Sequence, residues 1–440
     1  MKKLFPLPTK HRIGLSVTFV QVVLVVWFLN SSFWRERDPR LAESYPSQLL
    51  LNGPPTAAFR DNLRPEVKYV TSWPANGWSN QVIEFMNLIY LAQMTERVPI
   101  IPRFRPVHLD PSLPHMDFGD VFDVPRLRRA TGIPILEWRQ VKDLKSEIIE
   151  ELGCWDIQNK TWDYGSEYLD PPVDLKLDIS YTRARDWVRL ASHAEDAPSL
   201  LLWPLAALVS FTPRAIQLPT FPAAEPSRIH GTSHPPDTHL FCCNSMYFGL
   251  EALEETDMHP AWQSVGRHMY FTESIQGIGE AYIRRAFGLG EGEVVPPYIA
   301  IHARRGDFSV WCEIWGVPST ECFAPISAYA QRVQEMQTYI YESRGIRVTH
   351  VIATSDEEDS GWWAGVSALG WKRADHKSER TVQVYGAWYP MFIDAVIQSS
   401  ALGFIGTATS TVSILARRRV GEHHGVSEMV QWGWEGADEH

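Results

Sequence analysis

The chain has 440 residues, of which 45% are hydrophobic and 21% are charged, and its formal net charge is -11. This length is too great for one ordinary core and suggests two domains, and the composition is that of a folded protein. Because nucleic-acid binding requires a basic face, the net negative charge argues against a nucleic-acid partner.

The N-terminus carries an apolar segment, Ile13–Leu29, whose 17 residues include no formal charge. This is the lower limit for a membrane-spanning helix, and basic residues are concentrated before it rather than after it. We expect a cytoplasmic tail (1–12), a transmembrane signal anchor in the lipid bilayer (13–29) and a lumenal stem (30–64). The protein would then be a single-pass type II membrane protein of the Golgi or endoplasmic reticulum. A cleaved signal peptide is the alternative, although no clear cleavage site follows the apolar run.

The five cysteines are consistent with an oxidising lumen. Cys312 and Cys322, ten positions apart, flank a segment that we interpret as a loop closed by a disulfide, and Cys154 could pair with Cys242 or Cys243. An odd number leaves at least one thiol unpaired within the chain. A glycosylation sequon at 159–161 would lie in the correct compartment.

The first half of the folded part begins with a strand–helix–strand pattern. "KYVTSW" (68–73) predicts a strand, "PANGWSNQ" (74–81) a turn, 80–96 a helix and "VPIIPRF" (98–104) a second strand. Such a βαβ unit implies a parallel sheet. A segment rich in Pro, Ser and His at 218–239 is expected to be a loop or a connection between domains.

The second half repeats the alternation of strands and helices. We expect helices within 263–287 and at 325–343, 385–400 and after 410, and strands at 298–303, 348–354 and 402–406. The predicted fold class is α/β, with two facing Rossmann-like domains (65–255 and 256–440) and a ligand site in the cleft between them.

The strand "IAIHARRGDFSV" (299–310) ends in two arginines. Guanidinium groups cannot enter a core unpaired, yet open α/β sheets bind ligands at this end of their strands. Arg304 would supply a planar clamp for a diphosphate, and His302, two residues earlier, would share its face. Arg305 would point the other way and pair with Asp307 or another carboxylate. An adhesive Arg-Gly-Asp tripeptide is the alternative, but such tripeptides occupy exposed loop tips.

The segment "GTATSTVS" (406–413) places five hydroxyl groups at a strand-to-helix turn, which favours phosphate binding at the helix N-terminus. A simple N-cap with surplus hydroxyls is the alternative. Asp394, on a mostly apolar helix, is either structural or a carboxylate that accepts two N–H groups of guanine.

Two other segments have simpler interpretations. His230, His234 and His239 precede Cys242 and Cys243, but their spacing matches no zinc pattern, so we interpret them as loop histidines. "DEED" (356–359) could bind a cation, and we interpret it as a solvated charged run.

Three blocks of the chain together resemble the protein O-fucosyltransferase family and its relatives. The first block is the early turn of the family, matched by Gly77-Trp-Ser-Asn80-Gln81, then a helix and Glu96-Arg-Val-Pro-Ile100. The second is its His-x-Arg-Arg-x-Asp motif, matched by His302, Arg304, Arg305 and Asp307. The third is its late Asp followed by Phe-Ile-Gly-Thr-x-x-Ser-Thr-x-Ser, matched by Asp394 and 404–413. The resemblance spans roughly 68–420 and implies a GT-B glycosyltransferase whose donor is GDP-fucose.

The resemblance also implies roles for these residues. Arg304 would hold the β-phosphate as a catalytic residue, and Asn80, which matches an asparagine of one branch, would orient the acceptor hydroxyl. The predicted donor-binding residues are His302, Asp394, Thr409, Ser410, Thr411 and Gly77. A glutamate that serves as general base in another branch has no counterpart here, since Ala75 and Asn76 occupy its neighbourhood. The base is therefore unassigned, unless the leaving phosphate serves.

The resemblance implies an inverting transfer of fucose to a protein Ser/Thr or a glycan hydroxyl, without a metal or other cofactor. The chain agrees on the metal, since it contains no Asp-x-Asp pair of the kind that holds Mn²⁺ on a sugar nucleotide. Two alternatives remain: a GT-B transferase using another nucleotide sugar, and a catalytically inactive lumenal sugar-binding or scaffold protein.

Overall fold

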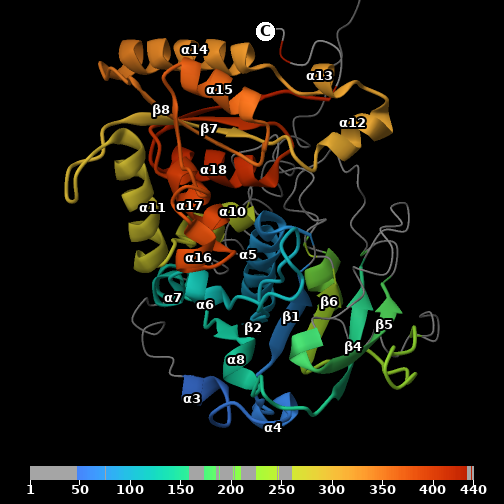
Figure 1. Ribbon diagram of the computed structural model, residues 1–440. Helices are drawn as coiled ribbons and strands as arrows, with labels where there is room; N and C mark the ends of the chain where they lie inside the picture. The colour runs from blue at the N-terminus through green and yellow to red at the C-terminus, as the bar shows by residue number, and fades with distance from the viewer. Residues whose placement is uncertain are drawn as a thin grey trace, which may run out of the picture.

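In the computed structural model, one parallel β-sheet lies in the upper part of the molecule and a second in the lower part, with helices between them (Figure 1). The structure describes residues 47–74, 76–157, 173–184, 204–209, 224–244 and 260–433, together with the single positions 188, 202, 246 and 438. The predicted α/β class is confirmed.

The first sheet has the order β3-β2-β1-β6-β4-β5, and every pairing is parallel. Its strands are β1 (Tyr69–Trp73), β2 (Val98–Ile101), β3 (Leu136–Glu137), β4 (Glu150–Asp156), β5 (Leu177–Arg183) and β6 (Leu240–Asn244). The predicted strands at 68–73 and 98–104 correspond to β1 and to a shorter β2. The strand order changes direction beside β1, since β2 lies on one side of it and β6 on the other.

The second sheet has the order β11-β10-β7-β8-β9, again with parallel pairings throughout. It comprises β7 (Tyr298–Ala303), β8 (His350–Ser355), β9 (Lys372–Arg373), β10 (Gly403–Thr407) and β11 (Val426–Val430). The three predicted strands of this half correspond to β7, β8 and β10. The order changes direction between β7 and β10, which are hydrogen-bonded neighbours.

The helices of the first half are short, apart from α5. They are α3 (Ser47–Leu50), α4 (Phe59–Asn62), α5 (Trp78–Thr95), α6 (Phe118–Val121), α7 (Val124–Thr131) and α8 (Trp138–Val141). Alpha-helix α5 ends at Glu96, which adopts the left-handed conformation with φ 54° and donates its N–H to the carbonyl of Ala92.

The helices of the second half range from short turns to α14, which has 19 residues. They are α10 (Pro260–Ser264), α11 (Glu273–Phe287), α12 (Ser309–Trp315), α13 (Ser319–Cys322), α14 (Ile326–Arg344), α15 (Ser360–Ala368), α16 (Thr381–Tyr385), α17 (Tyr389–Ser399) and α18 (Thr411–Glu422). Helix α11 shows how local sequence sets the ends, because Thr272 caps its first turn and Gly288, at φ 71°, closes its last.

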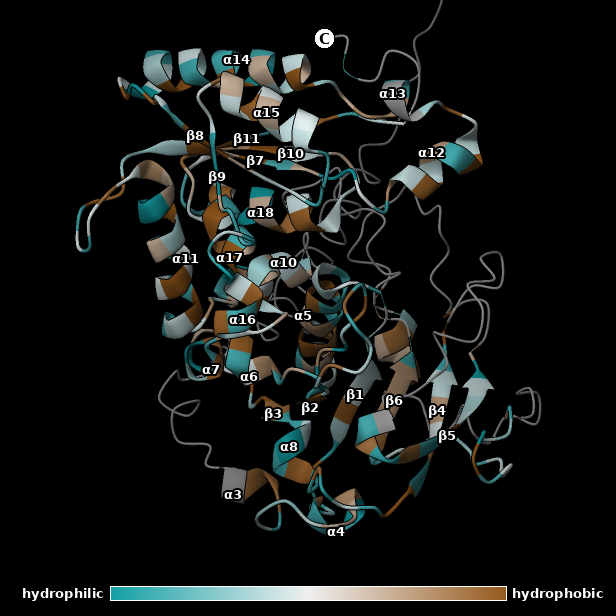
Figure 2. Ribbon diagram, viewed as in Figure 1, coloured by the Kyte–Doolittle hydropathy of each residue, from teal (hydrophilic) through white to brown (hydrophobic). Residues whose placement is uncertain are grey.

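An apolar cluster joins the two halves. Trp78, at the start of α5, lies 5.4 Å from Phe392 of α17, measured between ring centroids, and it also stacks near Phe122 and Phe271. Leu415 of α18 belongs to the same cluster. Hydrophobic residues accordingly gather on α5 and α17 in Figure 2. Because both halves bury side chains in this cluster, it fixes the N-terminal end of α5 beside the second half.

The disulfides are Cys154–Cys242 and Cys312–Cys322, and Cys243 is a buried free thiol. The Cys312–Cys322 pairing is confirmed, but the segment between the two cysteines is not the loop that we expected. Residues Ser309–Trp315 form α12 and Ser319–Cys322 form α13.

Among the residues that the structure describes, no helix is both long enough and apolar enough to span a membrane. The expected transmembrane segment, 13–29, and the sequon at 159–161 lie outside the described residues. The expected domain boundary at 255/256 also lies outside them and stays a prediction.

Candidate functional site

The site lies where two neighbouring strands of the second sheet end. Strands β7 and β10 run parallel in register, with Ile405 opposite Ile301, so the segments 302–305 and 407–411 leave the sheet at the same edge. The strand order also changes direction between these two strands. In open α/β sheets a crevice for ligands forms at such a position.

A buried hydrogen-bond network holds this edge together around Thr407. The Thr407 hydroxyl donates to the carbonyl of His302 at 3.0 Å and accepts the backbone N–H of Arg304 at 2.9 Å. Ser413 Oγ accepts the Thr407 N–H at 3.0 Å and lies 2.7 Å from Nδ1 of His302. The network therefore fixes the backbone of Arg304 against the turn that leads into α18.

His302 is buried within this network. The residue is only 6% exposed, and its pKa is lowered to about 4. Burial is the main cause; the charge of Asp356 opposes it and the charge of Arg304 adds to it. The ring is therefore neutral at neutral pH. Sequence analysis did not single out Thr407 or Ser413, although both lie in the predicted 406–413 segment.

The turn before α18 contains an unusual backbone conformation. Thr409 is exposed and has φ 61°, in the left-handed region that β-branched residues rarely adopt. The indole N–H of Trp432 donates to the carbonyl of Ala408 at 3.0 Å and to Thr409 Oγ1 at 3.1 Å, which holds this conformation. Such strain is commonly retained at ligand sites. Ser410 follows as the N-cap residue, but its side chain caps no backbone N–H of α18.

The N-terminal ends of α5 and α18 meet, although they come from opposite halves. Thr411, the first residue of α18, donates its hydroxyl hydrogen to Asn80 Oδ1 at 2.6 Å, and Ser79 Oγ lies 2.7 Å from Thr411 Oγ1. We call Ser79, Asn80 and Thr411 the helix junction. Gly77, the N-cap residue of α5, supplies no side-chain cap either. Two helix ends with positive partial charge and uncapped first turns thus converge, which favours an anion.

The two arginines have separate partners. Arg304 pairs with Asp307 at 2.6 Å and with Asp356 at 2.8 Å, whereas Arg305 donates from Nε to Glu357 at 2.6 Å. Of the two partners expected for Arg305, another carboxylate is confirmed and Asp307 is not, because Asp307 lies in the turn that follows β7 and faces Arg304 instead. Arg305 points toward the end of β8 and also stacks over Phe323, with its guanidinium carbon 4.8 Å from the ring centroid.

The acidic run 356–359 is not simply solvated, contrary to our expectation. Asp356 accepts the backbone N–H of Arg305 at 2.8 Å in addition to its ion pair with Arg304. Glu357 holds the side chain of Arg305, and Asp359 caps the first turn of α15. The run therefore anchors both arginines, because it follows β8, the neighbour of β7 in the sheet.

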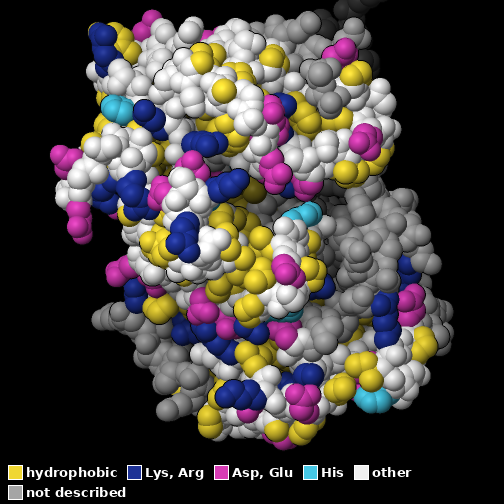
Figure 3. Space-filling model, in the orientation of Figure 1, with side chains coloured by type: hydrophobic (Ala, Val, Ile, Leu, Met, Phe, Trp, Pro, Cys, Tyr) yellow, Lys and Arg dark blue, Asp and Glu magenta, His cyan; other side chains and the backbone are white. Residues whose placement is uncertain are grey.

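His108, a residue of the first half, lies close to Asp307, the ion-pair partner of Arg304. Its Nδ1 lies 3.8 Å from an oxygen of Asp307, and a Cβ added to Gly77 would lie 3.0 Å from its Cδ2. A side chain at position 77 would thus crowd His108. In Figure 3 the surface is hollowed between the upper and lower parts of the molecule. Nothing in the sequence marked His108, which is a lone histidine in a loop.

Asp394 does not stand free for a ligand, because its carboxylate contacts His376. Its Oδ1 lies 3.0 Å from Nε2 of His376, whose Nδ1 lies 3.1 Å from Thr381 Oγ1. Burial by itself would lower the pKa of His376, but the hydrogen bond and charge of Asp394 outweigh it and raise this pKa. In the described part of the chain, the contacts of Asp394 do not extend to the Thr407 network or the helix junction.

Comparisons with known proteins identify the family of the chain. Residues 69–421 match the model of a family described as GDP-fucose protein O-fucosyltransferase. Among curated proteins no sequence matches.

Solved structures of POFUT1 resemble the chain. The apo form is 14% identical with a TM-score of 0.50, and the complex with GDP-fucose is 13% identical with a TM-score of 0.52; each match covers 84% of this chain and 99% of that one. A complex with GDP is 14% identical with a TM-score of 0.51, covering 83% and 99%. At such identities the likeness shows the fold.

Proposed function

Because the chain belongs to the GDP-fucose protein O-fucosyltransferase family and is a fucosyltransferase, we propose that it transfers fucose from GDP-fucose with inversion and without a metal ion. The acceptor is a hydroxyl group of a protein Ser/Thr or of a glycan. The match to the family covers most of the chain, and one of the POFUT1 structures that it resembles contains GDP-fucose.

The helix junction carries this proposal. The first turns of α5 and α18, neither capped by a side chain, converge beside the end of β7 and Arg304. Helix N-termini bind phosphate groups through backbone N–H groups and the helix dipole. A diphosphate at the junction would be held by both halves at once, through Thr409, Ser410 and Thr411 of one half and Gly77 and Asn80 of the other.

Arg304 stabilises the leaving GDP in this mechanism. Its guanidinium is already oriented by Asp307 and Asp356, so little ordering is needed when the diphosphate binds. Asp307, the more exposed of the two carboxylates, is the partner that the diphosphate displaces or shares. Arginine and helix N–H groups then stabilise the negative charge that develops as the bond to fucose breaks.

The remaining roles concern the acceptor and the nucleoside. Asn80 orients the acceptor hydroxyl, whose proton passes to the leaving phosphate, since no carboxylate occupies the position before the α5 turn. His302 and Asp394 contact the nucleoside. For Asp394, that role requires the carboxylate to accept guanine N–H groups while His376 holds its other side.

The location of the enzyme is a further part of the proposal. We place the catalytic part in the lumen of the Golgi or endoplasmic reticulum, anchored by residues 13–29 as a type II membrane protein. The length of this apolar segment and the excess of basic residues before it support the assignment.

Calorimetric titration with GDP, UDP, ADP and IDP tests the donor assignment. GDP should bind most tightly, and IDP, which lacks the exocyclic amino group of guanine, should bind more weakly. The Asp394→Ala variant should lose the preference for GDP over IDP. Tighter binding of UDP or ADP would contradict the fucosyl donor, and slow hydrolysis of GDP-fucose without acceptor should be detectable in an active enzyme.

A further inference from the structure

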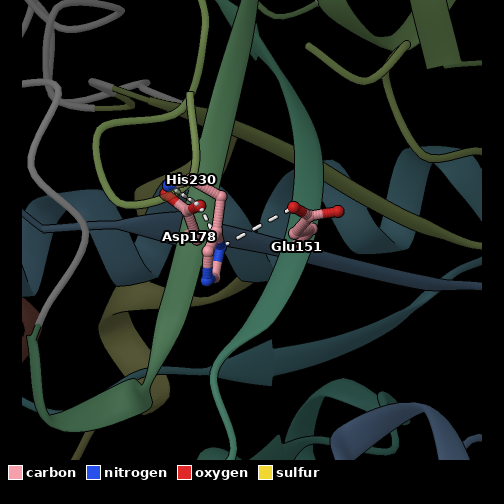
Figure 4. A group of neighbouring side chains, drawn as sticks. All are labelled: Glu151, Asp178 and His230. Carbon is pink, nitrogen blue, oxygen red and sulfur yellow. Dashed lines mark hydrogen bonds and ion pairs between the residues drawn. The ribbon is translucent and has the colours of Figure 1, made fainter. Parts of the chain in front are cut away.

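A second cluster of chemically capable side chains lies at the outer edge of the first sheet (Figure 4). Glu151 of β4 and Asp178 of β5 are direct partners in the register of the two parallel strands, so their side chains lie on the same face. His230, from the 224–239 segment, lies over them. Glu151 and Asp178 stand near the beginnings of their strands, opposite the edge where β1 leads into the helix junction.

Three ligand atoms are already gathered, one each from Glu151, Asp178 and His230, within 4.8 Å of one another. Nδ1 of His230 lies 2.8 Å from Asp178 Oδ2 and 3.6 Å from Glu151 Oε1. In a tetrahedral zinc site with bonds of about 2.0–2.1 Å, ligand atoms are about 3.3 Å apart. The observed separations lie on either side of that value.

His234 offers a fourth ligand. Its Nε2 lies 2.6 Å from Glu151 Oε2, so the two histidines reach the same carboxylate from positions four residues apart. Two imidazoles and two carboxylates form a donor set that suits Zn²⁺.

Hydrogen bonds orient both carboxylates. Asp178, whose side chain is only 1% exposed, accepts the backbone N–H groups of Ile229 and His230 at 3.0 and 2.9 Å. Thr232 donates its hydroxyl hydrogen to Glu151 Oε1 at 2.7 Å. Outer hydrogen bonds of this kind position the ligands in protein metal sites.

The segment that carries the histidines is packed closely on the sheet. A Cβ on Gly153 of β4 would lie 2.0 Å from the carbonyl oxygen of Pro235, so only glycine permits this approach. Ser180 Oγ accepts the backbone N–H of His234 at 2.9 Å. The imidazole positions are therefore fixed by the backbone around them, not only by their carboxylate partners.

A cavity of about 800 Å³ opens onto the cluster and is lined in part by Glu151, His230 and His234. It gives a hydrated ion a path to the ligands and leaves room for a water molecule as an additional ligand.

The zinc pattern that includes His239 and the cysteines is not formed. Cys242 is in a disulfide, and His239 Nε2 bonds to the carbonyl oxygens of Arg64 and Val67.

We propose that Glu151, Asp178, His230 and His234 form a zinc-binding site that pins the 224–239 segment to β4 and β5. This role is structural and separate from fucosyl transfer, because the cluster lies at the opposite edge of the sheet from the helix junction. Binding replaces the direct contacts between histidine and carboxylate with bonds to one ion.

The test uses the full-length chain, treated with EDTA and dialysed, and titrated calorimetrically with ZnSO₄. We expect one Zn²⁺ per chain and a higher melting temperature with zinc. The double variant His230→Ala/His234→Ala should bind zinc at least about 100-fold more weakly. The His423→Ala variant removes a histidine of the second half, at the C-terminal end of α18, and should bind zinc as the wild type does.

Two further measurements keep the test decisive. Co²⁺ in place of Zn²⁺ should give a visible absorption band that the double variant lacks, and GDP affinity should be the same in all three proteins, which shows that the variants are folded. Zinc affinity that is equal in the double variant and the wild type, or no zinc binding by the wild type, would overturn the proposal. Because GDP binding is measured separately, that result would leave the proposed fucosyl transfer intact.

Discussion

Asn80 and Thr411 are joined by a 2.6 Å hydrogen bond, although 331 residues separate them in the sequence. The bond connects the first turn of α5 to the first residue of α18, and thereby connects the two halves of the molecule at the point where a donor diphosphate would bind. If the diphosphate binds at both helix ends, as proposed, contacts at this position should affect both the packing of the halves and ligand binding.

Two substitutions of Asn80 should separate these effects. Asn80→Asp keeps an oxygen that accepts from Thr411 and adds a negative charge that suits a helix N-terminus, so the melting temperature should be unchanged or higher. The same charge should weaken GDP binding at least about tenfold, the equivalent of about 1.4 kcal/mol. Asn80→Ala should instead lose about 0.5–1.5 kcal/mol of stability. Calorimetry and thermal melting measure both effects. As a control, Gln334→Glu adds the same charge to the exposed face of α14 and should leave GDP affinity unchanged. Unchanged GDP affinity in Asn80→Asp would exclude the helix junction as the diphosphate site.

Arg304→Ala should lower turnover by roughly 10²–10³-fold, the scale expected when one donor to a developing negative charge is removed. Arg304→Lys should recover little of this loss, because an ammonium group cannot reproduce the planar fork that contacts two oxygens. The measurement is kcat for GDP-fucose turnover in both variants. Normal turnover by Arg304→Ala would show that another group stabilises the leaving GDP.

Arg305→Ala should act mainly on stability. The substitution leaves Glu357 without its 2.6 Å partner and removes the stacking on Phe323, with an expected loss of about 1.5–3 kcal/mol in the free energy of unfolding. GDP affinity should change little, because the backbone N–H of residue 305 still bonds to Asp356. Denaturant unfolding and GDP titration, run on the same preparation, test this. A stable variant that fails to bind GDP would reverse the roles of the two arginines.

The burial of His302 predicts acid sensitivity. Its pKa is about 4 in the folded protein and about 6.5 in an unfolded chain, so the unfolded state binds more protons between these values. The stability contributed by the neutral ring is complete above about pH 6.5 and is lost as the pH falls toward 4, at no more than about 1.4 kcal/mol per pH unit. His302→Asn should flatten this dependence. The check is the difference in unfolding free energy between the two proteins at pH 4.5, 5.5 and 7; a constant difference would mean that His302 does not titrate as stated.

Chelation should leave fucosyl transfer unchanged. If Arg304 and the helix N–H groups stabilise the leaving diphosphate, no cation is needed there. Turnover is measured with and without EDTA at a temperature well below the melting transition, so that loss of zinc from the 224–239 segment does not affect the result. Activity that EDTA abolishes and Mn²⁺ restores would contradict this part of the mechanism.

The sequence was most informative where strands are buried on both faces. Strands β7 and β10 could be predicted because Tyr298–Ala303 and Gly403–Thr407 are short apolar runs followed by polar residues, and these polar residues proved to lie side by side. Strand β5 was missed because Asp178, Ser180 and Thr182 interrupt its apolar pattern. These residues are buried, and Asp178 and Ser180 are paired by the 224–239 segment, which local sequence patterns do not reveal.

The partners of the site residues were likewise beyond the sequence. The motif identified Arg304 and Arg305, but the choice of carboxylate for each depends on how β8 and the turn after β7 are placed in space. The contact between Asn80 and Thr411 depends on the packing of two halves, so only the three-dimensional arrangement reveals it.

The adjacent cysteines on β6 determine which of two disulfides is compatible with the folded sheet. Cys242 and Cys243 are consecutive in a strand, so they face opposite sides of the sheet; Cys242 lies in the apolar cluster that contains Cys154, and Cys243 lies in the other. A bridge from Cys154 to Cys243 would therefore require β6 to turn over, so that the side chains of each face of the strand would enter the cluster on the opposite side of the sheet. Pairing of β6 with its neighbours selects the correct thiol, and a mispaired bridge would trap a chain whose strand alignment failed before oxidation.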